Sequence, residues 1–267
     1  MTSTAAERWS AQLAEWGIPD DILAQAPASP WSHEVATFSV DDTLDREGMS
    51  ARVTREVLPL SGGVVLDVGC GGGRSSAVLV PPAETLIGVD ENVTMLAAFV
   101  DAARSWDVAA QAVHGRWPDV APLTPVADVV VCHHVFFNVA DAVPFAMALT
   151  EHARLAVVVE TTVRHPLSGW TRAWKHFWGI DRPTGPTDAD LVAVLREAGL
   201  EPEVWHSERA PLSRHSRDPS TLLPAARRRL CLGPERDGEL TEYLARHPIE
   251  FIDTVATLRW PGAATIP

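Results

Sequence analysis

The chain has 267 residues, of which 35 are acidic and 22 are Lys or Arg, giving a formal net charge of −13 and a pI near 5.1. Nucleic acids are bound through clustered basic side chains, so this charge argues against them as partners and favours a small-molecule or peptide substrate.

The apolar runs are only as long as strands, and no membrane contact is expected. The three widely spaced cysteines, Cys70, Cys132 and Cys231, indicate a reducing compartment and no metal site. Because no apolar signal segment follows Met1, we expect a cytoplasmic protein.

The first 60 residues carry the pattern of helices. Apolar residues recur at three- and four-residue spacing over 4–16 and again over 43–58, as on the buried face of an amphipathic helix. A shorter helix is expected between Pro19 and Pro27, because a proline can begin a helix but does not continue one. These elements predict a helical N-terminal cap over residues 1–60.

The most informative stretch is 64–79. Apolar residues interrupted only by Asp67 lead into a glycine-rich loop, 69–73, and a helix can begin at Arg74. Glycines allow positive φ angles and let a ligand approach the main chain, while the first N–H groups of the following helix point toward that ligand. The pattern predicts a site for a nucleotide-type cofactor.

The spacing of these glycines distinguishes between two cofactors. A dinucleotide fingerprint requires glycine at the sixth loop position, where this chain has Arg74 or Ser76, depending on the frame. An acidic residue two positions before three alternating glycines instead suits a ligand with an amino group and a sulfonium. In this form the stretch resembles motif I of class I S-adenosylmethionine-dependent methyltransferases. The resemblance implies that S-adenosylmethionine is the cofactor and that it is bound by Asp67, Gly69, Cys70, Gly71 and Gly73. A NAD(P)-dependent oxidoreductase and a non-catalytic S-adenosylmethionine-binding partner protein remain alternatives.

The second predicted strand, 85–90, ends in an acidic residue. The Asp90 carboxylate can accept hydrogen bonds from both hydroxyls of a ribose, an arrangement common to several nucleoside cofactors. The resemblance further implies that Glu91 and Met95 lie beside the adenine.

A third strand is predicted over 108–113, and Arg116 follows it where members of the family often have an acidic residue. This departure weakens the expectation that a side chain binds the adenine amine. Arg116 or Trp117 can instead lie along the adenine face, although Trp117 could simply close the loop.

A second informative stretch, 128–139, is a buried strand that ends in His133 and His134 and continues into a turn with Phe137 and Asn138. Ligands of open α/β sheets lie beyond the carboxyl ends of the strands, which places both histidines at the cofactor rim. The stretch resembles motif IV of the same methyltransferases, which flanks the methionine part of the cofactor and the reacting atom. If the acceptor is a hydroxyl, His134 or His133 is a candidate general base near pH 7. A structural hydrogen bond to a neighbouring loop is the alternative role.

A fifth strand is predicted over 155–160, and the segment 161–186 after it is an aromatic helical insertion. Four aromatic residues share one side of its helix: Trp170, Trp174, Phe177 and Trp178. Such a stripe is either core or the wall of an apolar pocket. In the second case Trp170 and Trp174 bind the acceptor, together with Phe137 and Asn138.

The rest of the chain supplies a helix over 187–200, a strand around Val204, helices over 222–231 and 235–246, and a last strand over 251–260. The strand count and the resemblance imply an α/β fold, a Rossmann-like, seven-stranded, mostly parallel sheet of order 3-2-1-4-5-7-6 with helices on both faces.

Residues 61–267 then form the methyltransferase domain. N-terminal additions in this family commonly cover the cofactor, which makes Trp31 and Phe38 candidates for substrate binding. The expected function is O- or N-methylation of a small, hydrophobic or aromatic acceptor, with the oligomeric state left open.

Overall fold

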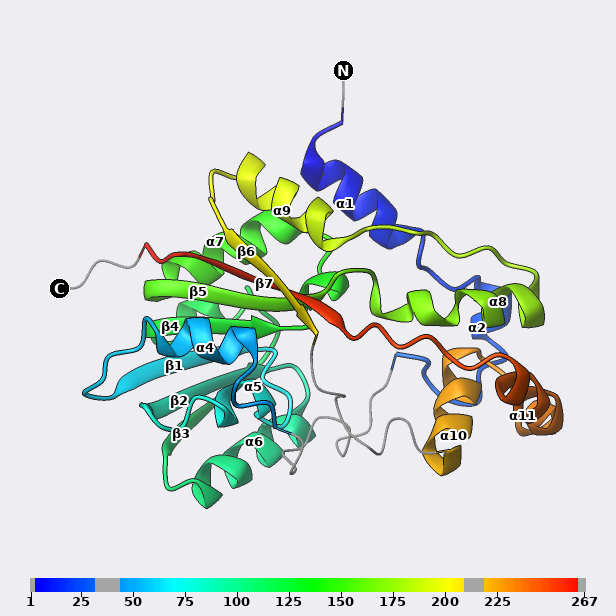
Figure 1. The fold of residues 1–267 in the computed structure, drawn as a ribbon, viewed down its shortest axis with the longest axis horizontal. Helices are drawn as coiled ribbons and strands as arrows, with labels where there is room; N and C mark the ends of the chain where they lie inside the picture. The colour runs from blue at the N-terminus through cyan, green and yellow to red at the C-terminus, as the bar shows by residue number, and fades with distance from the viewer. Residues whose placement is uncertain (1–2, 32–43, 209–218, 264–267) are drawn as a thin grey trace.

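The computed structural model describes residues 3–31, 44–208 and 219–263, which form a central sheet covered by helices on both faces (Figure 1). The strands are β1 (Gly63–Val68), β2 (Ala83–Asp90), β3 (Ala109–His114), β4 (Ala127–His133), β5 (Ala153–Thr162), β6 (Glu203–Glu208) and β7 (Thr254–Pro261). Their order in the sheet is β3-β2-β1-β4-β5-β7-β6, and β7 runs antiparallel to both β5 and β6. The predicted fold class and strand order are confirmed.

Helices cover both faces of the sheet because the central strands are apolar on both sides. Val129, Val130 and Val131 of β4 are all fully buried, as is typical of parallel strands between two helical layers. One layer contains α1 (Ala5–Ala14), α7 (Ala142–Glu151) and α9 (Asp188–Glu197). The other contains α4 (Met49–Arg55), α5 (Arg74–Ala77) and α6 (Val93–Ser105).

The N-terminal segment divides between these two layers. Helix α1 packs against α7 and α9, where the fully buried Trp9 stacks on Phe137 with ring centroids 5.6 Å apart. The Trp9 indole N–H donates to the carbonyl of Val139 over 2.8 Å. Helix α4 instead lies against β5 and β7, in the other helical layer.

A third apolar cluster lies beyond the carboxyl ends of the strands, at the right of Figure 1. We call it the helical subdomain; it consists of α2 (Asp20–Leu23), η3 (Pro166–Trp170), α8 (Thr171–Trp178), α10 (Pro219–Arg229) and α11 (Asp237–Arg246). The aromatic stripe forms its core, with Trp170, Trp174 and Phe177 all buried. Short 3-10 turns connect other elements: η1 (Ala121–Leu123), η2 (Phe136–Asn138) and η5 (Pro234–Arg236). None of the described helices is long and apolar enough to cross a membrane.

Candidate active site

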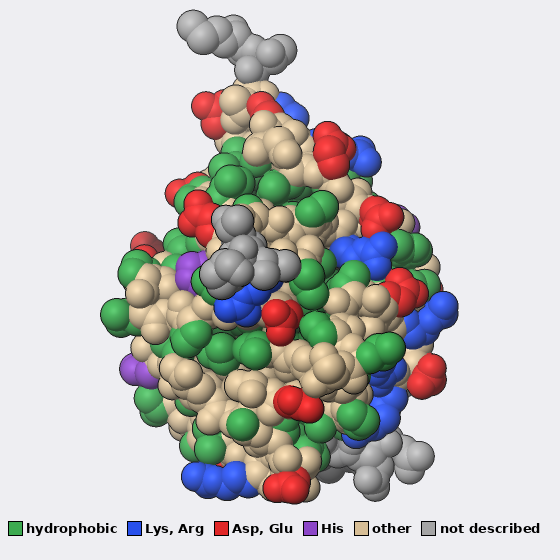
Figure 2. Space-filling view, turned by 90° about the vertical axis from the view of Figure 1, so that its left-hand side faces the viewer, with side chains coloured by type: hydrophobic (Ala, Val, Ile, Leu, Met, Phe, Trp, Pro, Cys, Tyr) green, Lys and Arg blue, Asp and Glu red, His purple; other side chains and the backbone are tan. Residues whose placement is uncertain are grey.

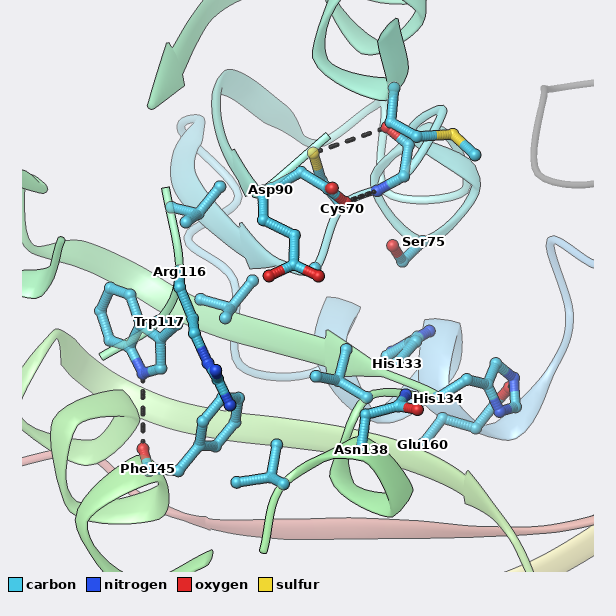
Figure 3. Close-up of a pocket in the computed structure, with 18 of the residues that line it drawn as sticks. Cys70, Ser75, Asp90, Arg116, Trp117, His133, His134, Asn138, Phe145 and Glu160 are labelled. Carbon is cyan, nitrogen blue, oxygen red and sulfur yellow. Dashed lines mark hydrogen bonds and ion pairs between the residues drawn. The ribbon is translucent and has the colours of Figure 1, made fainter. Parts of the chain in front are cut away.

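A cavity of about 1130 Å³ opens at the carboxyl ends of β1, β2 and β4. Its wall is formed by the loop after β1, the end of β2, the turn after β3 and the end of β4, with Asp90, Arg116, His133 and Asn138 around one space (Figure 3). Strand order reverses at β1 and β4, and an open α/β sheet binds ligands at this switch point. The position of the cavity therefore follows from the topology.

The glycine loop forms one side of the cavity with its backbone. The N–H groups of Gly69 and Cys70 donate to the carbonyl of Val89, over 2.8 and 3.1 Å, which folds the loop onto the end of β2. Gly69 has a φ of +74°, and a Cβ there would lie 2.4 Å from the Cγ2 of Val135. A side chain at this position is therefore excluded both by the backbone conformation and by the neighbouring loop.

Asp90 lies at the cavity with both carboxylate oxygens already accepting backbone hydrogen bonds. Its Oδ2 accepts from the N–H of Gly71 and its Oδ1 from the N–H of Asn92, each over 2.9 Å. A carboxylate has about four lone-pair sites, so each oxygen keeps a further acceptor site for a ligand hydroxyl. The two backbone bonds fix the orientation of the group that we expect to bind the ribose.

Asp67 lies behind the glycine loop rather than at its mouth. Its side chain is fully buried, and its Oδ2 accepts hydrogen bonds from the hydroxyls of Ser75 and Ser76, over 2.6 and 2.5 Å. Burial raises the pKa of this carboxyl group, while the two serine hydroxyls act in the opposite direction. The structure therefore gives Asp67 the role of connecting β1 to α5, without direct access to the cavity.

Gly73 also lies outside the cavity wall. It precedes α5 in a left-handed conformation, and a Cβ there would approach the ring of Phe99. Cys70 does line the cavity, but burial raises the pKa of its thiol well above the usual value, which disfavours the reactive thiolate.

The expected adenine residues all lie at the cavity: Glu91, Met95, Arg116 and Trp117. Met95 is buried and Arg116 is exposed. The Trp117 indole is buried, its N–H points toward the carbonyl of Phe145 at 3.4 Å, and its ring meets His152 edge-on at 4.9 Å. Trp117 thus closes the base of this wall, while Arg116 extends along it (Figure 3).

The two histidines at the end of β4 both line the cavity but differ in their surroundings. Burial lowers the pKa of His133, and the carboxylates of Glu160 and Asp67 only partly oppose this effect. Its Nε2 is buried without a hydrogen-bond partner among the described residues. His134 instead places its Nε2 3.1 Å from Oε1 of Glu160.

Residues 65–157 match the family model described as a methyltransferase domain. This part of the chain is a methyltransferase domain. The nicotinamide-dependent alternative is thereby set aside, in agreement with the missing third glycine of the dinucleotide fingerprint.

Solved structures share the fold of this methyltransferase at low sequence identity. Magnesium protoporphyrin IX methyltransferase from Synechocystis PCC 6803, with bound S-adenosylhomocysteine, is 15% identical with a TM-score of 0.51 over 82% of this chain and 81% of that one. The YcgJ protein from Bacillus subtilis is 12% identical with a TM-score of 0.54 over 80% of this chain and 97% of that one. No curated protein matches the sequence significantly. The structural likeness concerns the fold alone.

The expected substrate residues of the methyltransferase are only partly brought together. Trp31 and Asn138 line the cavity, and Phe38 lies outside the described residues. Phe137 is buried behind the cavity against Trp9, because the turn after β4 directs it into the helical layer.

The expectation that Trp170 and Trp174 wall the acceptor site is wrong. Both rings lie in the core of the helical subdomain, where α10 and α11 cover them. The sequence pattern left core and pocket open, because the partner helices come from a distant part of the chain.

Among the cavity residues that were not predicted, Glu160 and Ser50 matter most because they contact each other beside His134. Glu160 ends the apolar run of β5, and Ser50 lies in α4; both line the cavity. Glu160 could have been predicted, because it is a carboxylate at the end of β5, and the carboxyl ends of the parallel strands β4 and β5 lie at the same edge of the sheet. Ser50 had no such signal.

Proposed function

We propose that this methyltransferase transfers a methyl group to a hydroxyl or amino group of a small, hydrophobic or aromatic molecule. The observation that carries the proposal is the pair His134 and Glu160 in the wall of a cavity that also contains the cofactor loop. Trp31, Leu44 and Val135 give the same cavity apolar surface. An apolar wall with a few convergent polar groups is typical of small-molecule sites.

The residues present fit S-adenosylmethionine. The cavity, at about 1130 Å³, exceeds the usual range for one small molecule, so it has space for a cofactor and an acceptor together. Gly69 and Gly71 offer main chain without side chains, and Asp90 offers oriented acceptors for ribose hydroxyls. When bound, S-adenosylmethionine supplies an activated methyl group that leaves its sulfonium sulfur for the acceptor and yields S-adenosylhomocysteine.

His134 is the candidate general base for a hydroxyl acceptor. As the neutral imidazole it can take the acceptor proton on one ring nitrogen while the other stays bonded to Glu160. The remaining task of the protein is to align the acceptor and to exclude water. Asn138, on the same wall, can orient the polar group of the acceptor.

Charge and thiol chemistry support a small-molecule substrate and a cytoplasmic location. The net charge is −13, and acidic and basic side chains are interspersed on the face in Figure 2, unlike the continuous basic surface that a nucleic acid requires. Cys70, Cys132 and Cys231 are all buried free thiols, which fits a reducing compartment.

Calorimetry and labelled methyl transfer test the proposal. The purified chain should bind S-adenosylhomocysteine in preference to NADH, and it should transfer label from S-adenosylmethionine to members of a panel of phenols and aromatic amines. His134→Gln should lower kcat on a phenol by about 10²-fold. His206→Gln, which changes a histidine near the far edge of the sheet that is bonded to Asp188, is the control. Preferential binding of NADH, or labelling only of RNA or protein, would overturn the proposal.

A further inference from the structure

The Glu160 carboxylate is held on two sides at the end of β5. Its Oε2 accepts a 2.6 Å hydrogen bond from the hydroxyl of Ser50, and its Oε1 lies 3.1 Å from the Nε2 of His134. Ser50 is buried, and the Glu160 and His134 side chains are only 14% and 22% exposed. The three groups therefore form a shielded chain from α4 to the cavity.

The backbone of His134 contributes to this arrangement. Consecutive residues of a strand point to opposite faces, but His134 leaves the strand with a φ of +60°, a conformation that few residues other than glycine adopt. Its N–H donates to the carbonyl of Glu160 over 2.7 Å. His134 is thus bonded to Glu160 through both its backbone and its ring, and strained backbone held in this way is frequent at active sites.

The charge state of Glu160 fits this contact. Burial by itself would raise the pKa of its carboxyl group, but the hydrogen bonds that it accepts from His134 and Ser50, together with the nearby imidazoles, hold that pKa well below the usual range. A carboxylate that stays ionised accepts hydrogen bonds only, so the Nε2 facing it must carry the ring proton.

We propose that Glu160 is a positioning residue that fixes His134 as the Nε2–H tautomer and that Ser50 in turn fixes Glu160. This inference rests on the proposed role of His134 as base. In this tautomer the lone pair is on Nδ1, which is the atom that accepts the acceptor's proton. The adjacent carboxylate then stabilises the imidazolium that forms, as in other carboxylate–histidine pairs.

The tautomer can be measured without knowing the acceptor. In the full chain labelled with 15N-histidine and saturated with S-adenosylhomocysteine, the ring 15N shifts of His134, assigned with His134→Gln, should report Nε2–H and an unprotonated Nδ1. Glu160→Ala should shift the population toward Nδ1–H, and Ser50→Ala should do so partially. Glu160→Gln, which keeps a carbonyl acceptor, should restore part of the Nε2–H signal.

Glu239→Gln is the matched control, because Glu239 faces His176 at 3.6 Å on the helical subdomain, away from the cavity. It should change the His176 signals and leave those of His134 unchanged.

An unchanged His134 tautomer in Glu160→Ala would overturn the inference. A more than tenfold loss of S-adenosylhomocysteine affinity in this variant would also overturn it, because Glu160 would then be a cofactor-binding residue. On an accepted phenol, Glu160→Ala should lower kcat by about 10²-fold with little change in KM. If no phenol or amine is methylated but the tautomer responds as stated, the proposed acceptor class fails and the positioning role stands.

Discussion

The N–H of Gly71 donates a 2.9 Å hydrogen bond to the Oδ2 of Asp90, which joins the loop after β1 to the end of β2. The same carboxylate accepts from Asn92 at the start of α6. Two parts of the expected cofactor site are therefore held in register by one side chain before any ligand binds.

Asp90→Ala should weaken binding of S-adenosylhomocysteine by about 10- to 100-fold, because hydrogen bonds to a charged group contribute roughly 1.5–3 kcal/mol. Titration calorimetry measures the change. Asp101→Ala, on the exposed surface of α6 where Asp101 pairs with Arg104, is the control and should bind as the parent chain does. An Asp90→Ala chain that is folded and binds with the parent affinity would show that the ribose is bound elsewhere.

Gly69→Ala should destabilise the fold and impair cofactor binding together. Both Gly69 and Gly199 have left-handed φ angles, +74° and +84°, but a Cβ at Gly199 would meet no heavy atom of the described residues within 4 Å. In Gly199→Ala the free energy of unfolding should therefore fall by only about 1–2 kcal/mol, the cost of a left-handed conformation for a residue with a Cβ. Gly69→Ala should lose clearly more, because its Cβ collides with Val135. Equal losses in urea unfolding would contradict the crowding at Gly69.

His165 should make the chain less stable in mild acid. It is buried beneath Trp16, with ring centroids 4.0 Å apart, and burial, together with the charge of Arg182, lowers its pKa from 6.5 to about 3. Between these values the unfolded chain binds a proton that the folded chain does not. Stability from this group is therefore lost as the pH falls below 6.5, with a slope of up to about 1.4 kcal/mol per pH unit.

Urea unfolding of the parent chain and of His165→Phe at pH 7, 6 and 5 measures this contribution. The free energy of unfolding of the parent should fall by roughly 2 kcal/mol more than that of His165→Phe between pH 7 and pH 5. Parallel curves would show that His165 does not stay neutral in the folded chain.

Trp174→Ala and Trp31→Ala should affect different properties, namely the stability of the chain and the KM for the acceptor. Trp174 is buried in the helical subdomain with the Arg182 guanidinium 5.0 Å from its ring, so its removal should destabilise the chain by about 3–5 kcal/mol and leave S-adenosylhomocysteine affinity unchanged. Trp31 is 45% exposed at the cavity, so its removal should affect acceptor KM more than stability. A large change in the acceptor KM of Trp174→Ala without loss of stability would show that the aromatic stripe does bind the acceptor.

The sheet was predictable because its strands are apolar runs separated by glycine and proline. Its strand order was predictable because the motif at 64–73 resembles motif I of class I S-adenosylmethionine-dependent methyltransferases, which implies that order. The placement of Gly69, Gly71 and Asp90 at one cavity was predictable because each follows the carboxyl end of a predicted parallel strand, and all three line the cavity. Such residues depend on local backbone geometry that the sequence encodes directly.

The roles of Trp174 and Ser50 depend on contacts between distant segments, and that of Asp67 depends on which way its side chain turns. The Asp67 side chain turns toward serines eight and nine residues later and does not line the cavity. Trp174 is covered by helices about 50 residues or more further along the chain, and Ser50 reaches a carboxylate 110 residues away. No local pattern distinguishes these partners from solvent or ligand.

The helical subdomain draws its helices from before the first strand, from between β5 and β6, and from between β6 and β7. Three separate stretches of sequence must therefore coexist for Trp170 and Trp174 to be covered. Removing the first 26 residues, or replacing 161–186 alone by the corresponding segment of a relative, would leave apolar surface uncovered on the remaining helices of the subdomain. For protein engineering, the helices beyond the strands behave as one inseparable part, whereas single residues of the cavity wall, such as Trp31, can be varied individually.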